Sequence, residues 1–366
     1  MKNLVFSLSI LLSFSVQAKT YTTGGVKFTI EKLFEGSDAI WGFDFLNSKE
    51  ASSLVFSERD GKLKYLDLKT KKASDITGVP KVFAESQGGL LDVYMDHKTN
   101  QLYLTYSEPV KGGATTSLYR GKLSSDNKSL IGDRLFQAKA VASGGIHFGS
   151  RVVIDKDGFI FMSVGERNDR KQAQELSNHQ GKVLRLNPEG SAPKDNPFVD
   201  TKDALPEIWS YGHRNPQGLI IEPSGVLLEA EFGPRGGDEI NIIEKGKNYG
   251  WPVITYGKEY WGPSIGEKVK AGMMQPLYHW VPSINPSGIM LYNGKAFPKF
   301  EGNLFFATLA SSHIRRVITD KNRKILSEEK LLEDLEDRFR QVKTGPDGLI
   351  YFSTDSGKIY RMVPAT

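Results

Sequence analysis

The amino-acid sequence predicts an all-β fold, a six-bladed β-propeller built of four-stranded antiparallel blades. Short runs rich in β-branched and aromatic residues alternate with turns of Gly, Asp, Asn and Ser. One unit, a turn of the Asp-Gly kind followed by an alternating apolar strand, is visible six times. Successive copies start from about forty to nearly eighty residues apart, and a four-stranded blade needs about 40–45 residues. The pattern indicates about six blades, some with long insertions.

The six copies share turn residues that suit hairpins, because Gly and Asn readily adopt positive φ. The copies are ERDGKLKYLDL from Glu58, DHKTNQLYLTYS from Asp96, DKDGFIFMSVG from Asp155, EPSGVLLEAEFG from Glu222, KFEGNLFFATL from Lys299 and GPDGLIYFSTD from Gly345. The longest gaps flank the fourth copy and hold the densest polar motifs, so we expect the chemistry on loops there. A β-sandwich is the alternative, but six copies of one hairpin favour radial repetition.

Two C-terminal segments complete the expected ring. GKIYRMV, near the C-terminus, predicts a strand that closes the ring by joining an N-terminal strand. SEEKLLEDLEDRF, from Ser327, has the charges and leucine spacing of a helix. We expect it to be extended, because tertiary context overrides helix propensity in an all-β repeat.

The N-terminus, MKNLVFSLSILLSFSVQA, is typical of a secretory signal peptide cleaved near Ala18. A retained anchor is the alternative, but the apolar run is short and interrupted by serines. The expected organisation is a signal peptide over residues 1–18 and a single propeller catalytic domain over 19–366. The expected location is periplasmic or secreted, without membrane insertion.

Composition excludes several classes of function. The 366 residues include no cysteine, so disulfides, cysteine metal sites and thiol nucleophiles are excluded. The net charge of +5 is mild, and no block of five or more basic residues and no nucleic-acid motif is present. A basic balance still favours an anionic ligand through the summed field. No dinucleotide or P-loop fingerprint occurs in a suitable context.

A histidine and a glutamate lie on either side of the third repeat strand. His147 sits among glycines in SGGIHFGSR, and Glu166 follows nineteen residues later in SVGERND. If the strand returns to the same end of the blade, the two side chains meet. A carboxylate on Nδ1–H would leave Nε2 of His147 as a general base. A structural histidine is the alternative.

Three further motifs are polar enough to bind a ligand. YGHRNPQG starts at Tyr211, and EFGPRGGDEINIIEKGKNYGWP starts at Glu231. The second combines glycines and carboxylates and suggests bound calcium, although a solvated glycine loop fits the composition too. Arg338 and Arg340 stand at i and i+2, either as a carboxylate clamp or as two surface arginines. The aromatic residues that follow the glycine loop are blade packing or a stacking platform: Trp251, Tyr256, Tyr260, Trp261 and Trp280.

From about Gln87 onward the chain resembles the soluble pyrroloquinoline-quinone (PQQ)-dependent glucose/sorbosone dehydrogenases. The likeness is greatest to the bacterial periplasmic aldose sugar dehydrogenases. It rests on QGGLLDV, HFGSR, PEIWSYGHRNPQG, FGPRGGDEIN, KGKNYGWP and KTGPDG. The resemblance implies a six-bladed propeller that oxidises the C1 hydroxyl of aldoses to lactones and passes electrons to an external acceptor. It leaves the sugar, the acceptor and the choice of monomer or dimer open.

The resemblance also implies roles for particular residues. His147 is the implied catalytic base, oriented by Glu166. The implied PQQ contacts are Gln87, Arg214, Asn215, Tyr256, Tyr260, Arg338 and Arg340. The implied Ca²⁺ ligands are Gly233 and Pro234, with Glu239 and Tyr249 at a second calcium position. Within YGHRNPQG, the resemblance therefore assigns the cofactor contacts to Arg214 and Asn215 and gives no role to His213.

The chain departs from the family pattern at two places. Ala310, in TLASSH, replaces a lysine near the cofactor, and Phe232 replaces the common histidine before Gly-Pro. His313 lies near the first departure, and we expect it at the surface. Two other functions remain open: a propeller that binds a sugar or a partner without turnover, and a calcium-dependent lactonase, for which the sequence offers no clear carboxylate cluster.

Overall fold

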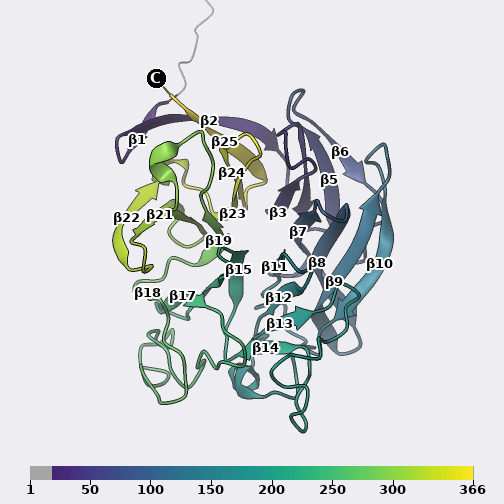
Figure 1. Ribbon diagram of the computed structural model, residues 1–366, viewed down its shortest axis with the longest axis vertical. Helices are drawn as coiled ribbons and strands as arrows, with labels where there is room; N and C mark the ends of the chain where they lie inside the picture. The colour runs from purple at the N-terminus through teal and green to yellow at the C-terminus, as the bar shows by residue number, and fades with distance from the viewer. Residues whose placement is uncertain (1–18, 366) are drawn as a thin grey trace, which may run out of the picture.

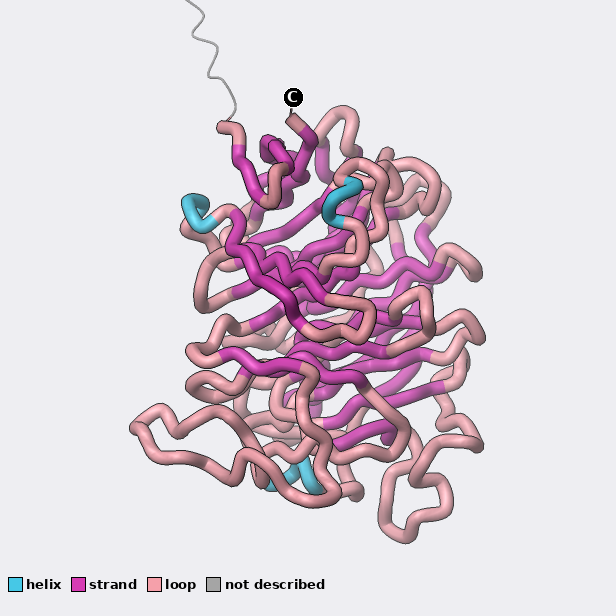
Figure 2. Tube along the Cα trace, turned by 60° about the vertical axis from the view of Figure 1, so that its left-hand side comes forward, coloured by secondary structure: helices cyan, strands magenta, loops and turns pink. Residues whose placement is uncertain are grey.

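The computed structural model describes residues 19–365, so the expected signal peptide lies outside the described residues. Residues 19–365 form six β-sheets arranged around a central axis (Figure 1), which confirms the six-bladed propeller. Helix is confined to three short 3₁₀ turns within this range (Figure 2): η1 (Arg170–Gln174), η2 (Pro298–Phe300) and η3 (Glu333–Leu335). Across the same residues, every helix is too short or too polar to cross a membrane.

Each blade is a meander of antiparallel strands that runs outward from the axis. The innermost strands, which contact one another around the axis, are β3 (Ile40–Phe45), β7 (Leu90–Asp96), β11 (Val152–Ile154), β15 (Pro216–Ile221), β19 (Pro286–Leu291) and β23 (Phe339–Thr344). The second strands are β4 (Ser53–Glu58), β8 (Gln101–Val110), β12 (Ile160–Val164), β16 (Leu227–Glu231), β20 (Leu304–Thr308) and β24 (Ile350–Thr354).

The outer half of each blade follows the same order. The third strands are β5 (Lys62–Asp67), β9 (Gly113–Leu123), β13 (Lys182–Leu186), β17 (Asp238–Ile242), β21 (Ile314–Thr319) and β25 (Lys358–Pro364). The fourth strands are β6 (Lys72–Ile76), β10 (Leu130–Gln137), β14 (Ile208–Tyr211), β18 (Tyr278–Trp280), β22 (Ile325–Leu331) and β2 (Val26–Glu35). The strand β1 (Tyr21–Thr23) adds a fifth strand to the last blade.

The ring closes as expected, through pairing of the two ends of the chain. β25 near the C-terminus pairs antiparallel with β2, from Phe28 opposite Pro364 to Glu35 opposite Lys358. The segment from Ser327 is extended within β22 and takes only one 3₁₀ turn, η3, before β23. The expectation of an extended segment is therefore confirmed apart from that turn.

Five of the six repeat copies mark the hairpin between the first and second strands of a blade. The copy from Glu58 instead spans the turn between β4 and β5, the second and third strands. The equivalent turn of that blade joins β3 to β4 through residues 46–52, which lack an Asp-Gly pair. The predicted number of blades is confirmed, but the first copy marks the second hairpin of its blade, whereas the other five copies mark the first hairpin of theirs.

Apolar side chains fill the spaces between neighbouring blades. One core cluster joins Tyr103 and Leu118 of one blade to Met162 and Leu184 of the next. Such face-to-face packing explains why second strands such as β12 and β20 are buried along their whole length, because every blade is covered on both faces.

One buried arginine crosses the axis. Arg151, just before β11, donates through Nη1 to Asp92 Oδ1 of β7 at 2.7 Å and through Nε to the Gln217 carbonyl of β15 at 2.6 Å. Its Nη2 donates to the carbonyls of Ser287 and Arg340, at 3.3 and 3.2 Å. A single side chain thus ties together the innermost strands of several blades.

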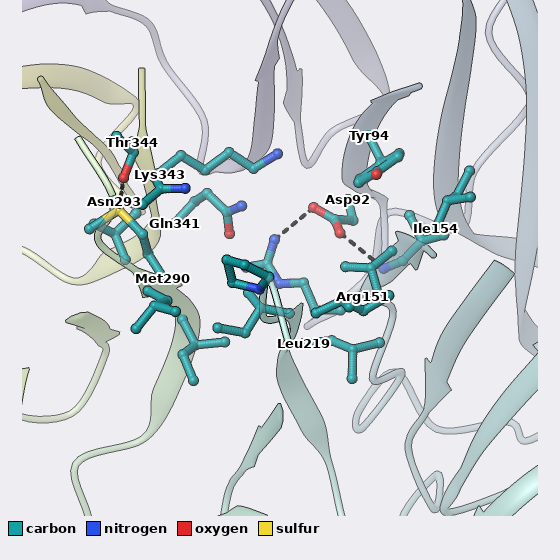
Figure 3. Close-up of a pocket in the computed structure, with 18 residues that line it drawn as sticks. Asp92, Tyr94, Arg151, Ile154, Leu219, Met290, Asn293, Gln341, Lys343 and Thr344 are labelled. Atoms are coloured by element: carbon teal, nitrogen blue, oxygen red, sulfur yellow. Dashed lines mark hydrogen bonds and ion pairs between the residues drawn. The ribbon is translucent and has the colours of Figure 1, made fainter. Parts of the chain in front are cut away.

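A cavity of about 370 Å³ lies where the innermost strands end (Figure 3). Its walls combine apolar side chains such as Leu219 and Met290 with the charged groups of Asp92, Arg151 and Lys343. Because Arg151 both lines this cavity and bonds to strand starts, it separates the cavity from the other mouth of the channel.

Candidate active site

The polar residues singled out in the sequence lie where the innermost strands begin. Gln87 precedes β7, His147 precedes β11, Arg214 and Asn215 precede β15, and Arg338 precedes β23. Direct hydrogen bonds join the Gln87, His147 and Asn215 segments at one mouth of the channel, and Arg340 of β23 donates to Gln217 Oε1 of β15 at 3.0 Å. These residues therefore come from four different blades.

His147 and Glu166 form a buried pair at this mouth. The His147 backbone is left-handed, with φ 54°, and its N–H donates to Gln87 Oε1 at 2.9 Å. The His147 ring bonds through Nδ1 to Glu166 Oε1. β12 runs back to the mouth, so Glu166, just past its end, reaches the histidine. With its proton on Nδ1, the ring has a lone pair on Nε2 that can accept a proton.

Close backbone packing holds the pair together. A Cβ on Gly165 would lie 2.2 Å from the His147 carbonyl oxygen, so a larger residue would force the loop away. Arg167 follows Glu166 and lies 3.4 Å over the ring of Phe148. Its Nη2 also donates to the Gly144 carbonyl at 2.8 Å. We did not predict a role for Arg167; its adjacency to Glu166 in SVGERND was the available signal.

Burial sets the protonation of His147. Burial lowers the pKa of His147 below the ordinary 6.5; the Glu166 carboxylate acts in the opposite direction, and Arg214 adds to the lowering. A base is active when neutral, so its activity is present above this pKa and lost as the pH falls through it.

We therefore expect the acid limb of a pH profile of kcat/KM to lie below pH 6.5. The physical reason is the lowered pKa of His147. The measurement is the steady-state rate of the sugar oxidation that the resemblance implies, with the implied cofactor added, across the pH range and with protein integrity checked at each pH. An acid limb at or above pH 6.5 would contradict the assignment of a buried imidazole as the titrating group.

Arg214 and Asn215 present polar groups beside the pair. Arg214 Nη1 donates to the Gly233 carbonyl at 3.1 Å, and Nη2 lies 3.5 Å from the Tyr260 hydroxyl. Asn215 Oδ1 accepts from the Gly149 N–H at 3.1 Å. Asn215 Nδ2 is buried and has no hydrogen-bond partner among residues 19–365. An orphaned donor at this position suits a ligand with acceptor oxygens.

His213 faces away from the mouth. It is fully buried, with Nδ1 3.2 Å from Glu231 Oε1 and Nε2 2.9 Å from Ser210 Oγ. Glu231 Oε2 accepts the backbone N–H of Arg214 at 2.5 Å. His213 and Glu231 therefore hold the loop that carries Arg214 and Asn215, and both of these side chains are buried as well.

Arg338 and Arg340 converge on one carboxylate that we did not predict. Arg338 Nε donates to Asp355 Oδ2 at 2.9 Å, and Arg340 Nε donates to Oδ1 at 2.8 Å. Arg340 is buried, whereas the Arg338 side chain is 54% exposed. Burial alone would raise the pKa of Asp355, but the two arginines outweigh it and hold that pKa below its ordinary value. Among residues 19–365 the Nη groups of Arg338 have no hydrogen-bond partner and are available to an anionic ligand, while Arg340 also bonds to Gln217 and Ser287.

The aromatic cluster divides into packing and exposed members. Trp280 and Trp251 are buried, so the packing interpretation holds for them. Tyr260 and Trp261 are 66% and 75% exposed, and Tyr260 reaches Arg214. Exposed rings beside the mouth are available for stacking on a planar ligand.

Tyr256 and Pro234 share a second cavity, whereas Gly233, the other residue of the first calcium position, lines a small cavity with Glu239 and Tyr249. Tyr256, Pro234 and Val281 line a space of about 530 Å³. The Gly233 carbonyl already accepts from Arg214 and has one lone pair left for an ion. A Cβ on Gly233 would lie 2.2 Å from the Gly236 carbonyl oxygen, so the loop requires glycine. The donor set of backbone carbonyls fits calcium.

The second calcium position, Glu239 and Tyr249, lines a small cavity of about 10 Å³ together with Glu231. The Tyr249 hydroxyl donates to the Ile242 carbonyl, so its backbone carbonyl is the group left for an ion. Burial, with the charge of Glu231, raises the pKa of Glu239 well above its ordinary value. A cation here would stabilise the charged form of the Glu239 carboxylate, so these residues fit the implied ion.

His313 is not at the surface, and that expectation was wrong. It is fully buried, its Nδ1 bonds to the Ser311 carbonyl at 2.8 Å, and Nε2 accepts from Arg315 at 3.1 Å. Burial lowers the pKa of His313 to about 4. It is therefore neutral at physiological pH and does not replace the cation that is missing at Ala310.

A shared signal explains the residues that we missed. Several second strands end at or just before an acid: Glu58 ends β4, Glu166 follows β12, Glu231 ends β16 and Asp355 follows β24. Three of these acids bond to groups at the mouth: Glu166 to the His147 ring, Glu231 to the Arg214 backbone, and Asp355 to the two arginines just before and within β23. The repeat copies end in SVGE, EAE and STD, so alignment of the copies with one another would have found Glu231 and Asp355.

The fold and the site together define a class: a propeller with a buried histidine–carboxylate base beside arginines at the channel mouth. A family profile described as Glucose / Sorbosone dehydrogenase matches residues 37–361. The chain is 39% identical, over 92% of both sequences, to the aldose sugar dehydrogenase YliI of Escherichia coli strain K12. It is 27% identical to quinoprotein glucose dehydrogenase B of Acinetobacter calcoaceticus, over 87% of this chain and 82% of that one.

A solved structure agrees with these sequence relatives. The soluble aldose sugar dehydrogenase (Asd) from Escherichia coli, in its apo-form, matches with a TM-score of 0.88 and 38% identity, over 92% of this chain and 100% of that chain. The chain therefore belongs to the Glucose / Sorbosone dehydrogenase family. By family it is a sugar dehydrogenase, an oxidoreductase.

Proposed function

We propose that the protein is a PQQ- and calcium-dependent enzyme that oxidises the C1 hydroxyl of aldose sugars to lactones. The observation that carries the proposal is the buried, neutral His147 held by Glu166 next to Arg214 and the unpartnered amide of Asn215. Family membership supports sugar oxidation, and the relative named a quinoprotein supports the cofactor class.

The protein's own residues supply the proton transfer and the positioning. When bound, PQQ would accept the hydride from C1, and Ca²⁺ would polarise its carbonyl. Nε2 of His147 takes the C1 hydroxyl proton, and Glu166 stabilises the imidazolium that forms. Loss of one proton and one hydride converts the cyclic aldose to its lactone. Electrons then pass to an external acceptor.

The remaining predicted residues would hold the cofactor. Anionic groups of PQQ suit Arg338, Arg214 and the Asn215 amide, and Tyr260 offers an exposed ring. Calcium would take carbonyls of Gly233 and Pro234, with a second ion at Glu239 and the Tyr249 carbonyl. We further propose export with cleavage near Ala18, in keeping with the N-terminal sequence.

A binding protein without turnover is the second candidate. Ala310 and the neutral His313 remove a cation from the mouth, and Arg340 is bonded to Asp355. Both observations weaken the attraction for an anionic cofactor. A sugar- or partner-binding propeller would keep the fold and lose the chemistry.

Reconstitution separates the two candidates. Purified apo-protein given PQQ and Ca²⁺ is expected to reduce a dye in the presence of mono- or disaccharide aldoses, because the base and its orienting carboxylate are in place. The control is the same protein with Ca²⁺ but without PQQ. Absence of PQQ binding by calorimetry, together with no turnover across the sugar panel, would reject the enzyme and favour the binding protein.

A further inference from the structure

Strands β16 and β17 place four polar side chains on one buried sheet face. Glu229 and Glu231 stand at i and i+2 on β16, and they pair directly with Asn241 and Glu239 on β17. Directly paired residues of antiparallel strands share a face. Asn241 Nδ2 accordingly lies 3.1 Å from a Glu229 oxygen, 3.4 Å from a Glu231 oxygen and 3.5 Å from a Glu239 oxygen.

None of the three carboxyl groups on this face forms an ion pair with a lysine or arginine among residues 19–365. Glu229 is fully buried, and its one side-chain hydrogen-bond partner among residues 19–365 is the Asn241 amide. Its Oε1, and Oδ1 of Asn241, have no hydrogen-bond partner in the same range. Burying charge without a partner is costly, so these oxygen atoms indicate a cationic ligand that the protein side chains do not provide.

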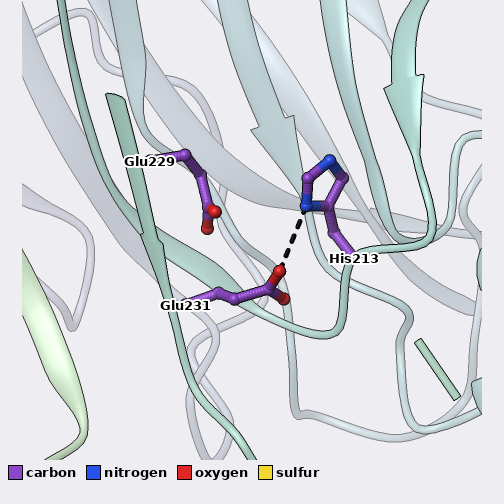
Figure 4. A group of neighbouring side chains, drawn as sticks. All are labelled: His213, Glu229 and Glu231. Carbon is purple, nitrogen blue, oxygen red and sulfur yellow. Dashed lines mark hydrogen bonds and ion pairs between the residues drawn. The ribbon is translucent and has the colours of Figure 1, made fainter. Parts of the chain in front are cut away.

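A histidine completes the set of ligand atoms (Figure 4). One ligand atom each from His213, Glu229 and Glu231 lie within 4.8 Å of one another. Metal–ligand bonds of about 2.0–2.2 Å to nitrogen and oxygen place ligand atoms at most about 4.4 Å apart, so an ion would draw these three atoms slightly closer together. Nε2 of His213 meets the Ser210 hydroxyl at 2.9 Å. With Nε2–H donating to that hydroxyl, Nδ1 offers its lone pair to an ion, as in metal sites whose second ring nitrogen is anchored.

We propose that a divalent first-row transition ion, Zn²⁺ or Mn²⁺, binds between Nδ1 of His213 and the carboxylates of Glu229 and Glu231. The imidazole ligand favours this class over Ca²⁺, which prefers an all-oxygen shell. The site uses different side chains from the calcium positions proposed at Gly233, Pro234, Glu239 and Tyr249, and it does not rest on the proposed function.

The ion would stabilise the loop that carries the candidate active site. Glu231 Oε2 accepts the Arg214 backbone N–H at 2.5 Å, and His213 directly precedes Arg214. An ion on these two side chains would therefore link β16 to that loop. Its role is structural, and we expect it to raise the melting temperature without PQQ or sugar.

Calorimetric titration of chelator-treated protein with ZnCl₂ and MnCl₂, in the absence of PQQ, tests the site. We expect one equivalent of either ion to bind and to raise the melting temperature. Glu229→Gln is expected to weaken binding about 100-fold, with the folded state checked by circular dichroism. Glu50→Gln, at an exposed acid before β4, is the matched control and is expected to leave the affinity unchanged. Anomalous scattering from Mn²⁺-soaked crystals should place the ion beside His213.

Three results would overturn the proposal. Folded wild-type protein that binds neither ion would exclude the site. An affinity unchanged by Glu229→Gln but lost in Glu239→Gln would place the ion at the proposed calcium position instead. Binding of Ca²⁺ alone, sensitive to Glu229→Gln, would refute the ion class. Because PQQ and sugar are absent, none of these results bears on the reconstitution assay.

Discussion

Replacement of His147 by glutamine is expected to lower kcat/KM for aldose oxidation by about 10²–10⁴-fold, the usual contribution of a positioned general base. Glutamine keeps a polar side chain of similar reach but cannot accept a proton at neutral pH. The His147 backbone N–H bond to Gln87 does not depend on the side chain, so the loop should persist. Steady-state dye reduction with saturating PQQ and Ca²⁺ measures the effect.

The control for this variant is His97→Gln, because His97 is exposed in the turn between β7 and β8. It should retain wild-type activity. Calorimetric titration should show that His147→Gln still binds PQQ, since the proposed cofactor contacts lie on other residues. Full activity in His147→Gln would remove this histidine from the mechanism.

Replacement of Glu166 by glutamine is expected to have the second largest effect, within the same range of about 10²–10⁴-fold in kcat. Glu166 acts through His147: its carboxylate fixes the proton on Nδ1 and stabilises the imidazolium. The neutral amide does neither reliably. Because the Glu166 carboxylate raises the pKa of His147 against the effect of burial, its loss should also move the acid limb of the pH profile to lower pH.

That pH shift distinguishes positioning from simple loss of structure. Glu50→Gln, at an exposed acid before β4, is the matched control and should change neither kcat nor the profile. A Glu166→Gln enzyme with reduced kcat but an unmoved acid limb would show that the carboxylate does not act on the titrating base.

The fold was predictable because its information is local and repeated. Hairpin turns and alternating strands recur along the chain, and closure by β25 follows from the terminal GKIYRMV segment. The phase of the first copy was not predictable in this way. The Asp-Gly turn at residues 60–61 has the same local chemistry whether it joins the first and second strands of a blade or the second and third.

The site was predictable only in part, because its contacts are long-range. The meeting of His147 with Glu166 depended on one strand returning to the mouth, and it does. The pairing of Arg340 with Asp355 needs the register of β23 and β24, and the contacts of Arg151 need the whole ring. Burial of His313 is likewise a property of packing, which a polar run such as SSH does not reveal.

The central claim is that His147 is the proton acceptor of a quinone-dependent sugar oxidation. The most direct test is an anaerobic single turnover, in which an aldose is added to protein loaded with PQQ and Ca²⁺ and the cofactor absorbance is followed. The account predicts rapid reduction of the bound cofactor in the wild type and little or none in His147→Gln at equal PQQ occupancy. Equal rates in the two proteins, or no reduction in either, would contradict it.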